Sequence, residues 1–238
     1  MLWLSRKDIE HISRRLLRDY LKKVPQKVDH IDPADFAEKM CGLQFTFADI
    51  SEAHDAIGLT ATSEVIITIP QRDGTRLDYE LDGKTAFIDQ SLVAENQIGR
   101  LNFTMMHEAA HQLFWMLYPE EYEAQTPHCV FRMTDEHTQY PVLDWEEWQT
   151  NVLTSFLLLP KELVYRHMAN VGLKDGISVL NRIYARKDYE RFSEAAKRLG
   201  VSKTALTIRL SQLGLVGRND LYDPYALVDI FPEKNEIA

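Results

Sequence analysis

Residues 105–114 read MMHEAAHQLF, which places His107 and His111 four positions apart with Glu108 directly after the first histidine. Apolar residues recur at helical spacing through this stretch and its flanks, and no glycine or proline interrupts the chain between Gly99 and Pro119. The pattern therefore predicts a helix. Side chains at positions i and i+4 of a helix lie one above the other, with Cβ atoms roughly 5–6 Å apart, so the two imidazoles face one point.

Two imidazoles that face one point can share a single metal ion. Glu108 lies about 100° around the helix from His107, where it can reach a water on such an ion but is badly placed as a third ligand. This geometry is typical of zinc hydrolases with the pattern H-E-x-x-H. The alternative is a pair of hydrogen-bonded core histidines, because both share an apolar stripe with Phe114. Chance gives such a string with a probability on the order of 0.02 in a chain of this length, so the metal interpretation needs a third ligand.

The candidate third ligand lies downstream, because a catalytic zinc site uses three protein ligands and one open position. Residues 144–160, DWEEWQTNVLTSFLLLP, predict a second amphipathic helix that the final proline ends. Glu147 and Asn151 share one face of it, so Glu147 can complete the ligand set and Asn151 can hold a histidine through its other ring nitrogen. Two alternatives remain open. Asp144 and Glu147 also fit a capping pair at a helix start, and Glu146 is a competing ligand.

Two further helices are predicted near the N-terminus from their capping residues. Ser5 followed by Asp8 is typical of a helix start, because the hydroxyl caps a free N–H while the acid lies in the positive first turn. Asp32 before Pro33 opens a second, short helix that we expect to end near Gly42.

The segment from residue 58 to 89 predicts strands. The runs EVIITIP, RLDYELD and KTAFID are rich in branched and aromatic residues and are separated by Asp-Gly pairs that suit tight turns. We therefore expect an antiparallel sheet of about three strands, with a helical chain after residue 100. Helices around a segregated antiparallel sheet make the predicted fold class α+β.

The composition indicates a globular protein of 238 residues with 45% apolar content. The N-terminus turns charged before an apolar run forms, so we expect no secretory signal, and no stretch reaches membrane-spanning length. Cys41 and Cys129 are too few for a disulfide framework, which favours a reducing cytoplasm. We expect no membrane partner. The net charge of -9 argues against a protein whose whole surface follows nucleic acid.

Two stretches resemble the ImmA/IrrE family of zinc metallopeptidases. GRLNFTMMHEAAHQLF is similar to the family's G-R-x-R-F-T-x-x-H-E-x-x-H, and EWQTNVLTSFLLLP is similar to its E-x-x-A-N-x-F-A-x-x-L-L-x-P. With looser similarity elsewhere, the resemblance covers residues 30 to 217. It implies a zincin-like fold, Zn²⁺ as cofactor, His107, His111 and Glu147 as its ligands, and Glu108 as the catalytic acid/base. It also implies regulatory proteolysis, by limited cleavage of a partner such as a helix-turn-helix repressor.

The chain departs from the family pattern at four positions and in one spacing. Thr150, Leu153 and Thr154 replace alanine, phenylalanine and alanine, Asn102 replaces arginine, and the segment 112–146 is wider than the family usually shows. That insert can form a lid or supply another ligand. Its candidate residues are His128, Cys129, Asp135, Glu136 and His137. The candidates for oxyanion stabilisation are Tyr118, Tyr140 and His137.

The C-terminal part supports a competing hypothesis. Residues 189–216 resemble a helix-turn-helix, with Leu199 to Ser202 as the turn and a presumed recognition helix from Lys203 to Leu213. From residue 174 to 218 there are 10 Lys/Arg and 4 Asp/Glu, a local charge of +6. The side chains expected on the exposed face are Lys203, Thr204, Thr207, Arg209 and Gln212. We expect packing or protein recognition here, and a DNA-binding regulator or a silent scaffold with a structural or sensory metal site is the alternative.

The predicted organisation has four parts. These are an N-terminal helix in 1–30, a zincin-like peptidase core in 31–165, a helical subdomain resembling a helix-turn-helix in 166–217, and a C-terminal tail in 218–238.

Overall fold

The computed structural model describes residues 3–24, 27–50, 56–61, 63–71, 73–122, 129–133 and 141–223, and within them the chain is α+β. The helices are α1 (Arg6–Lys23), α2 (Pro33–Cys41), α3 (Ile98–Leu117), α4 (Pro119–Tyr122), α5 (Pro141–Leu158), α6 (Lys161–Asn170), α7 (Arg186–Leu199) and α8 (Lys203–Gln212). The strands are β1 (Gln44–Ala48), β2 (Ala56–Ala61), β3 (Glu64–Pro70), β4 (Arg76–Asp82), β5 (Thr85–Asp89), β6 (Cys129–Met133), β7 (Ile177–Leu180) and β8 (Val216–Asn219). Two 3-10 helices, η1 (Gln90–Val93) and η2 (Glu95–Gln97), lead into α3.

The first two helices begin where their capping residues predict. Ser5 accepts a hydrogen bond from the Asp8 backbone N–H, and the Asp8 carboxylate accepts one from the Ser5 N–H, which is a complete capping box. Asp32 caps α2 through the N–H groups of its first turn, and α2 ends at Gly42 in a left-handed conformation. Both predictions are confirmed.

The sheet is larger and less regular than predicted. Strands β3, β4 and β5 form at the predicted runs, but β3 and β4 form a separate two-stranded sheet, while β5 joins a four-stranded sheet in the order β1-β5-β2-β6. Within that sheet β1 runs parallel to β5, so the prediction of a purely antiparallel sheet is wrong. Strand β2 was missed because all six of its residues are buried, which removes the alternation that marks a half-buried strand.

The prediction that the chain is helical after residue 100 is also wrong. Strand β6 completes the four-stranded sheet beside β2, and β7 pairs in parallel with β8. These strands have four or five residues each, too short to give a clear period in the sequence. The predicted boundary at residue 217 falls inside β8.

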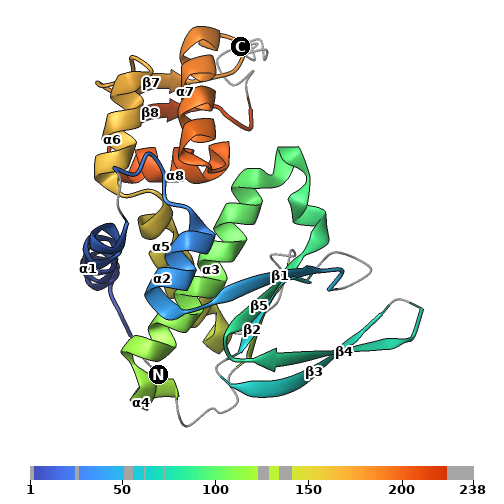
Figure 1. Ribbon diagram of the computed structural model, residues 1–238. Coiled ribbons are helices and arrows are strands. Elements are labelled where there is room, and N and C mark those ends of the chain that lie inside the picture. Colours follow the sequence, from blue (N-terminus) through green and yellow to red (C-terminus); the bar gives the residue numbers. More distant parts are fainter. Residues whose placement is uncertain are drawn as a thin grey trace, which may run out of the picture.

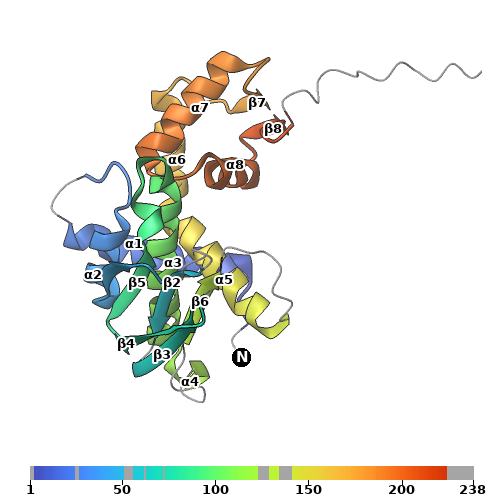
Figure 2. The ribbon, with the colours of Figure 1, turned by 90° about the vertical axis from the view of Figure 1, so that its right-hand side faces the viewer.

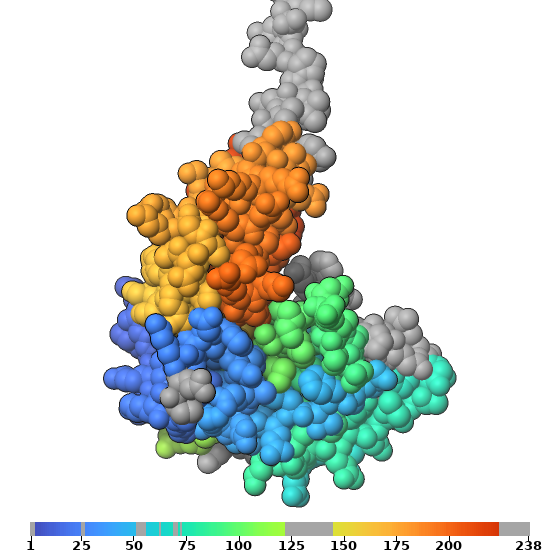
Figure 3. Space-filling model, turned by 45° about the horizontal axis from the view of Figure 1, so that its top comes forward, coloured from blue at the N-terminus to red at the C-terminus, as the bar shows by residue number. Residues whose placement is uncertain are grey.

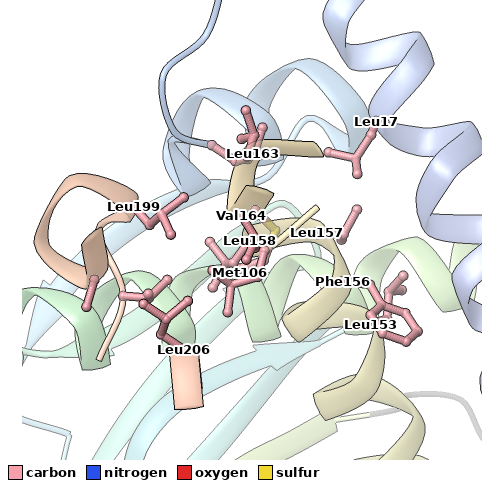
Figure 4. Packing of buried hydrophobic residues seen from close by; sticks show 14 of the residues in the cluster. Leu17, Met106, Leu153, Phe156, Leu157, Leu158, Leu163, Val164, Leu199 and Leu206 are labelled. Carbon is pink, nitrogen blue, oxygen red and sulfur yellow. The ribbon is translucent and has the colours of Figure 1, made fainter. Parts of the chain in front are cut away.

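Helix α3 lies at the centre of the molecule, with the sheet on one side and α2 and α5 packed against it (Figure 1). One apolar core joins α3 and α5 to the C-terminal helices, and Figure 4 shows Met106, Leu153, Val164, Leu199 and Leu206 within it. The C-terminal elements α6, α7, α8, β7 and β8 form a lobe that projects beyond the sheet (Figures 2 and 3). Within the described ranges, no helix is long and apolar enough to cross a membrane.

The lobe is fixed directly to the first turn of α3. A Cβ at Gly99 would lie 2.6 Å from the Val201 carbonyl carbon, so the turn before α8 can pack on α3 only because residue 99 has no side chain. Asn102 donates a hydrogen bond of 2.8 Å from its Nδ2 to the carbonyl oxygen of Gly200. Asn102 therefore ties α3 to the α7–α8 turn.

Candidate metal centre

Three polar residues of α3 are fully buried at its middle. His107, Glu108 and His111 have no exposed side-chain surface, although each can carry a charge. Their placement in one helix agrees with the sequence prediction, and the i, i+4 spacing brings the two ring centroids to 4.7 Å. The Nε2 atoms of His107 and His111 are 3.0 Å apart. Two ring nitrogens approach so closely only when a proton or a cation lies between them.

The third group comes from α5, which packs along α3. Glu147 places one carboxylate oxygen 3.1 Å from His107 Nε2 and the other 3.2 Å from His111 Nε2. Of the described residues, His107, His111 and Glu147 form one group whose potential ligand atoms lie within 4.8 Å of one another. The side chains of the predicted ligand set therefore lie together.

The donor set and its spacing fit zinc. Two imidazole nitrogens and one carboxylate are the ligands of many catalytic zinc sites. A tetrahedral ion with ligand distances of about 2.1 Å holds its ligand atoms roughly 3.4 Å apart. The three separations of 3.0, 3.1 and 3.2 Å are close to that value. Glu147 keeps 32% of its side chain exposed, so the centre has an opening to solvent.

The electrostatics of the centre favour a cation. Burial alone would keep His111 neutral, but the Glu147 carboxylate, with Glu146 and Glu108, raises the pKa of His111 from 6.5 to about 10. Burial alone would also raise the pKa of Glu147, yet the facing His111 and His107 hold it far below its usual range. A bound divalent ion would replace the His111 proton.

Aromatic side chains enclose the imidazoles along α3. The Phe103 ring lies 6.4 Å from the His107 ring, and the Trp115 ring lies 5.8 Å from the His111 ring, each measured between centroids. All four residues follow at i, i+4 spacing, so the histidines sit inside an aromatic row on one helix face. Such walls restrict both rings and lower the local dielectric constant, which strengthens electrostatic interactions at the centre.

The Glu147 carboxylate faces the two histidines of α3 and does not cap its own helix. Helix α5 begins at Pro141, so Glu147 lies in its second turn and the predicted capping alternative is wrong. The competing Glu146 approaches the other nitrogen of His111, with 3.7 Å between Oε1 and Nδ1, and the Thr150 hydroxyl lies 3.5 Å from the same Nδ1. These two residues can orient His111 from behind.

Asn151, the predicted outer partner of a histidine, lines an open groove next to Glu147. Within the described part of the chain no hydrogen bond joins it to His107 or His111. Its role at the centre stays a prediction.

Glu108 lies against strand β2, and this contact depends on a glycine that sequence reasoning missed. A Cβ built at Gly58 would collide with the Glu108 carboxylate and would lie 3.1 Å from Thr104 Cγ2. Gly58 also marks the register shift where β2 pairs with β6. A glycine inside the buried run AIGLTA was the available signal, since glycine within a strand marks a bulge or a close approach.

Several predicted candidates lie outside the described residues. The segments 123–128 and 134–140 contain His128, Asp135, Glu136, His137 and Tyr140, and the side chain of Cys129 is likewise outside the description. Tyr118 is described and follows α3 as its C-cap, about 10 Å along the helix axis from His111.

The presumed recognition helix differs from its predicted exposure. Thr207 and Arg209 of α8 are buried, at 3% and 5% exposure, so placing them on the exposed face was wrong. Arg209 donates from Nε to the Leu159 carbonyl oxygen and lies over the Phe156 ring, while the Thr207 hydroxyl donates to the Lys203 carbonyl. The exposed residues of α8 are Lys203, Thr204, Ile208, Ser211 and Gln212. Its basic character is therefore smaller than the sequence indicated.

No protein-family model matches this chain, and a search of curated proteins gives no match. The similarity to ImmA/IrrE peptidases stays a prediction based on two motifs, and the function is argued from the geometry of the centre.

Proposed function

We propose that this chain is a zinc-dependent endopeptidase with a zincin-like fold, which acts in the cytoplasm on a protein partner. The observation that carries the proposal is the convergence of His107, His111 and Glu147 from two helices, with the buried Glu108 on the same helix turn. A structural role explains the burial of single histidines, but it does not require two ring nitrogens and a carboxylate to meet at one point.

In this proposal zinc, when bound, supplies Lewis-acid activation of water and of the scissile carbonyl. His107, His111 and Glu147 would hold the ion, and Glu146 and Thr150 would keep the His111 ring in position. Glu108 would accept the proton of the attacking water and deliver it to the leaving amine. Its close fit against Gly58 restricts the carboxylate to few positions, which suits a group that must move a proton at one place.

The resemblance to ImmA/IrrE peptidases supports a regulatory substrate, such as a helix-turn-helix repressor. An enzyme of this kind has narrow specificity, so a generic substrate such as casein is a poor test. Metal content is the first measurement. Protein purified with zinc should hold about one ion per chain, and the Glu147→Gln variant should lose it. Equal zinc content in both proteins would refute the ligand assignment.

A DNA-binding regulator is the second candidate, and the charge of +6 between residues 174 and 218 favours it. A gel shift on random duplex DNA at several salt concentrations tests this hypothesis, because phosphate contacts give an affinity that falls steeply with salt. The buried Arg209 makes strong binding unexpected. A silent scaffold would bind zinc and show no difference in any cleavage assay between the wild type and Glu108→Gln.

A further inference from the structure

An open groove of about 1290 Å³ reaches from Glu147, one of the proposed metal ligands, to the C-terminal lobe. Glu147 and Asn151 of α5 line one part of it, and the facing wall is made by α7 and by the start of α8. The groove therefore connects a metal ligand with the helix pair that the metal chemistry does not use. A molecule held in it contacts Glu147 and so lies on the Glu147 side of the proposed metal centre.

The floor of the groove is apolar. Phe103 of α3 and Trp148, Val152 and Phe156 of α5 line it. Ile98 and Ile208 stand on its two sides, with 52% and 53% of their side chains exposed. Exposed branched side chains around an aromatic floor are typical of surfaces that bind apolar side chains of a partner.

The rim of the groove is positive, although the whole chain has a net charge of -9. Four cations line it, Arg6, Arg100, Lys197 and Lys203, whereas Glu147 is its one carboxylate among the described residues. The charge of Glu147 is already balanced by the facing histidines. Within the described ranges Arg6, Arg100 and Lys197 form no ion pair. Their charges are therefore available to a ligand.

Two helix N-termini add to this positive potential. The first turn of α3 and the start of α8 both line the groove, and they touch where Gly99 meets the backbone of Val201 and Ser202. Helix N-termini present free N–H groups and a partial positive charge. An acidic side chain that lies here would face this potential together with Arg100 and Lys197.

From the apolar floor, the positive rim and the position beside Glu147, we infer that the groove binds an acidic, partly apolar segment of the protein substrate next to the bond that is cleaved. The inference rests on the proposed peptidase function and names the substrate class. Carboxylates of the segment pair with Arg100 and Lys197, and its apolar side chains lie on Phe103 and Trp148. Duplex DNA shares the negative charge but has no group for an aromatic floor of this kind.

The test measures binding apart from cleavage, with zinc-loaded Glu108→Gln protein. Three fluorescent peptides of about ten residues share the same apolar positions and carry either Asp/Glu, Asn/Gln or Lys at the others. The acidic peptide should bind about tenfold or more tightly than the neutral one, the basic peptide should bind weakest, and added salt should reduce the difference.

Charge reversal localises the binding. R100E/K197E should weaken binding of the acidic peptide by about tenfold or more and leave binding of the neutral peptide nearly unchanged. R15E/R18E is the matched control, since it makes the same change in charge at exposed positions of α1 outside the groove. R100Q/K197Q, a milder variant, should give a smaller loss, and thermal melting checks that every variant is folded.

Each outcome separates the two proposals. Equal binding of the three peptides, or equal losses in R100E/K197E and R15E/R18E, would overturn the groove inference and leave the peptidase untouched. The groove inference would also be overturned if random duplex DNA displaced the acidic peptide and if R100E/K197E lost this DNA binding. Charge-selective binding by a protein that holds no zinc would support the groove and refute the peptidase.

Discussion

Helices α3 and α8 both bury polar side chains, but the partners of these side chains differ between the two helices. On α8 the Thr207 hydroxyl and the Arg209 guanidinium donate to backbone carbonyl oxygens, so their hydrogen bonds end within the fold. On α3 the histidines meet each other and the Glu147 carboxylate. Hydrogen bonds from buried side chains to the backbone stabilise the fold, whereas the convergent groups of α3 and α5 hold a metal ion in the proposed function. The comparison predicts that mutations of these α3 residues change zinc binding and catalysis, and that mutations of the buried α8 residues change the stability of the fold.

The largest expected effect is on catalysis. Glu108→Gln removes the proton acceptor and should lower cleavage of a partner protein by about 10²- to 10⁴-fold, because general acid–base catalysis contributes that much. Zinc content should stay near one ion per chain, since Glu108 is no ligand in the proposal. Full activity in this variant would show that Glu108 has no part in the reaction.

The next largest effect is expected on zinc affinity when a proposed ligand is replaced. Glu147→Gln should reduce zinc affinity at least about 100-fold, because loss of a mere orienting partner already costs 10- to 100-fold. Glu146→Gln is the matched control on the adjacent residue and should cost only about tenfold, because 3.7 Å separates its carboxylate oxygen from His111 Nδ1. A competition titration with a zinc chelator measures both variants. A larger loss in Glu146→Gln than in Glu147→Gln would exchange their roles.

The pH dependence of zinc binding follows from the raised pKa of His111. With a pKa of about 10, the folded metal-free protein keeps the His111 proton at neutral pH, and zinc has to displace it. Apparent zinc affinity should therefore rise about tenfold per pH unit between pH 6 and 8. The raised pKa also stabilises the folded metal-free protein. This contribution is fully present below pH 6.5, the pKa of the unfolded state, and it is lost as the pH rises through about 10. Zinc affinity that does not change with pH would contradict the coupling.

The contact between β2 and α3 should appear as a stability effect. Gly58→Ala should lower the free energy of unfolding by about 1–3 kcal/mol, since the new methyl group overlaps the Glu108 carboxylate. Gly58 does not have a positive φ, so backbone strain does not contribute. The double variant G58A/E108A should recover most of the loss in a urea titration. A double variant no more stable than G58A would place the clash elsewhere.

A stability effect of similar size is expected on α8. Arg209→Met should cost about 1–3 kcal/mol of stability, because it leaves the Leu159 carbonyl oxygen without its donor, and it should leave zinc affinity unchanged. Arg198→Met is the control, since that arginine pairs with Glu194 at the surface of α7 and should cost about 0.5 kcal/mol or less. Loss of zinc in Arg209→Met would break the division between the two helices.

The sequence predicted best the features that depend on neighbouring residues. The capping box of Ser5 and Asp8 and the start of α2 at Asp32 need only the first turn of each helix. The alignment of His107 and His111 follows from helical spacing alone. Glu147 was predicted from its residue type and face, although α5 begins earlier than expected and places it in the second turn.

The sequence by itself determined that two helices form the centre and which side chains they present to it, because helix geometry acts over a few residues. Only the tertiary structure decided the parallel pairing of β1 with β5, the contact of Gly58 with Glu108, the burial of Arg209 and the groove between α5 and α8. Each of these brings together segments far apart in the chain, and their packing depends on shapes that local periodicity does not encode.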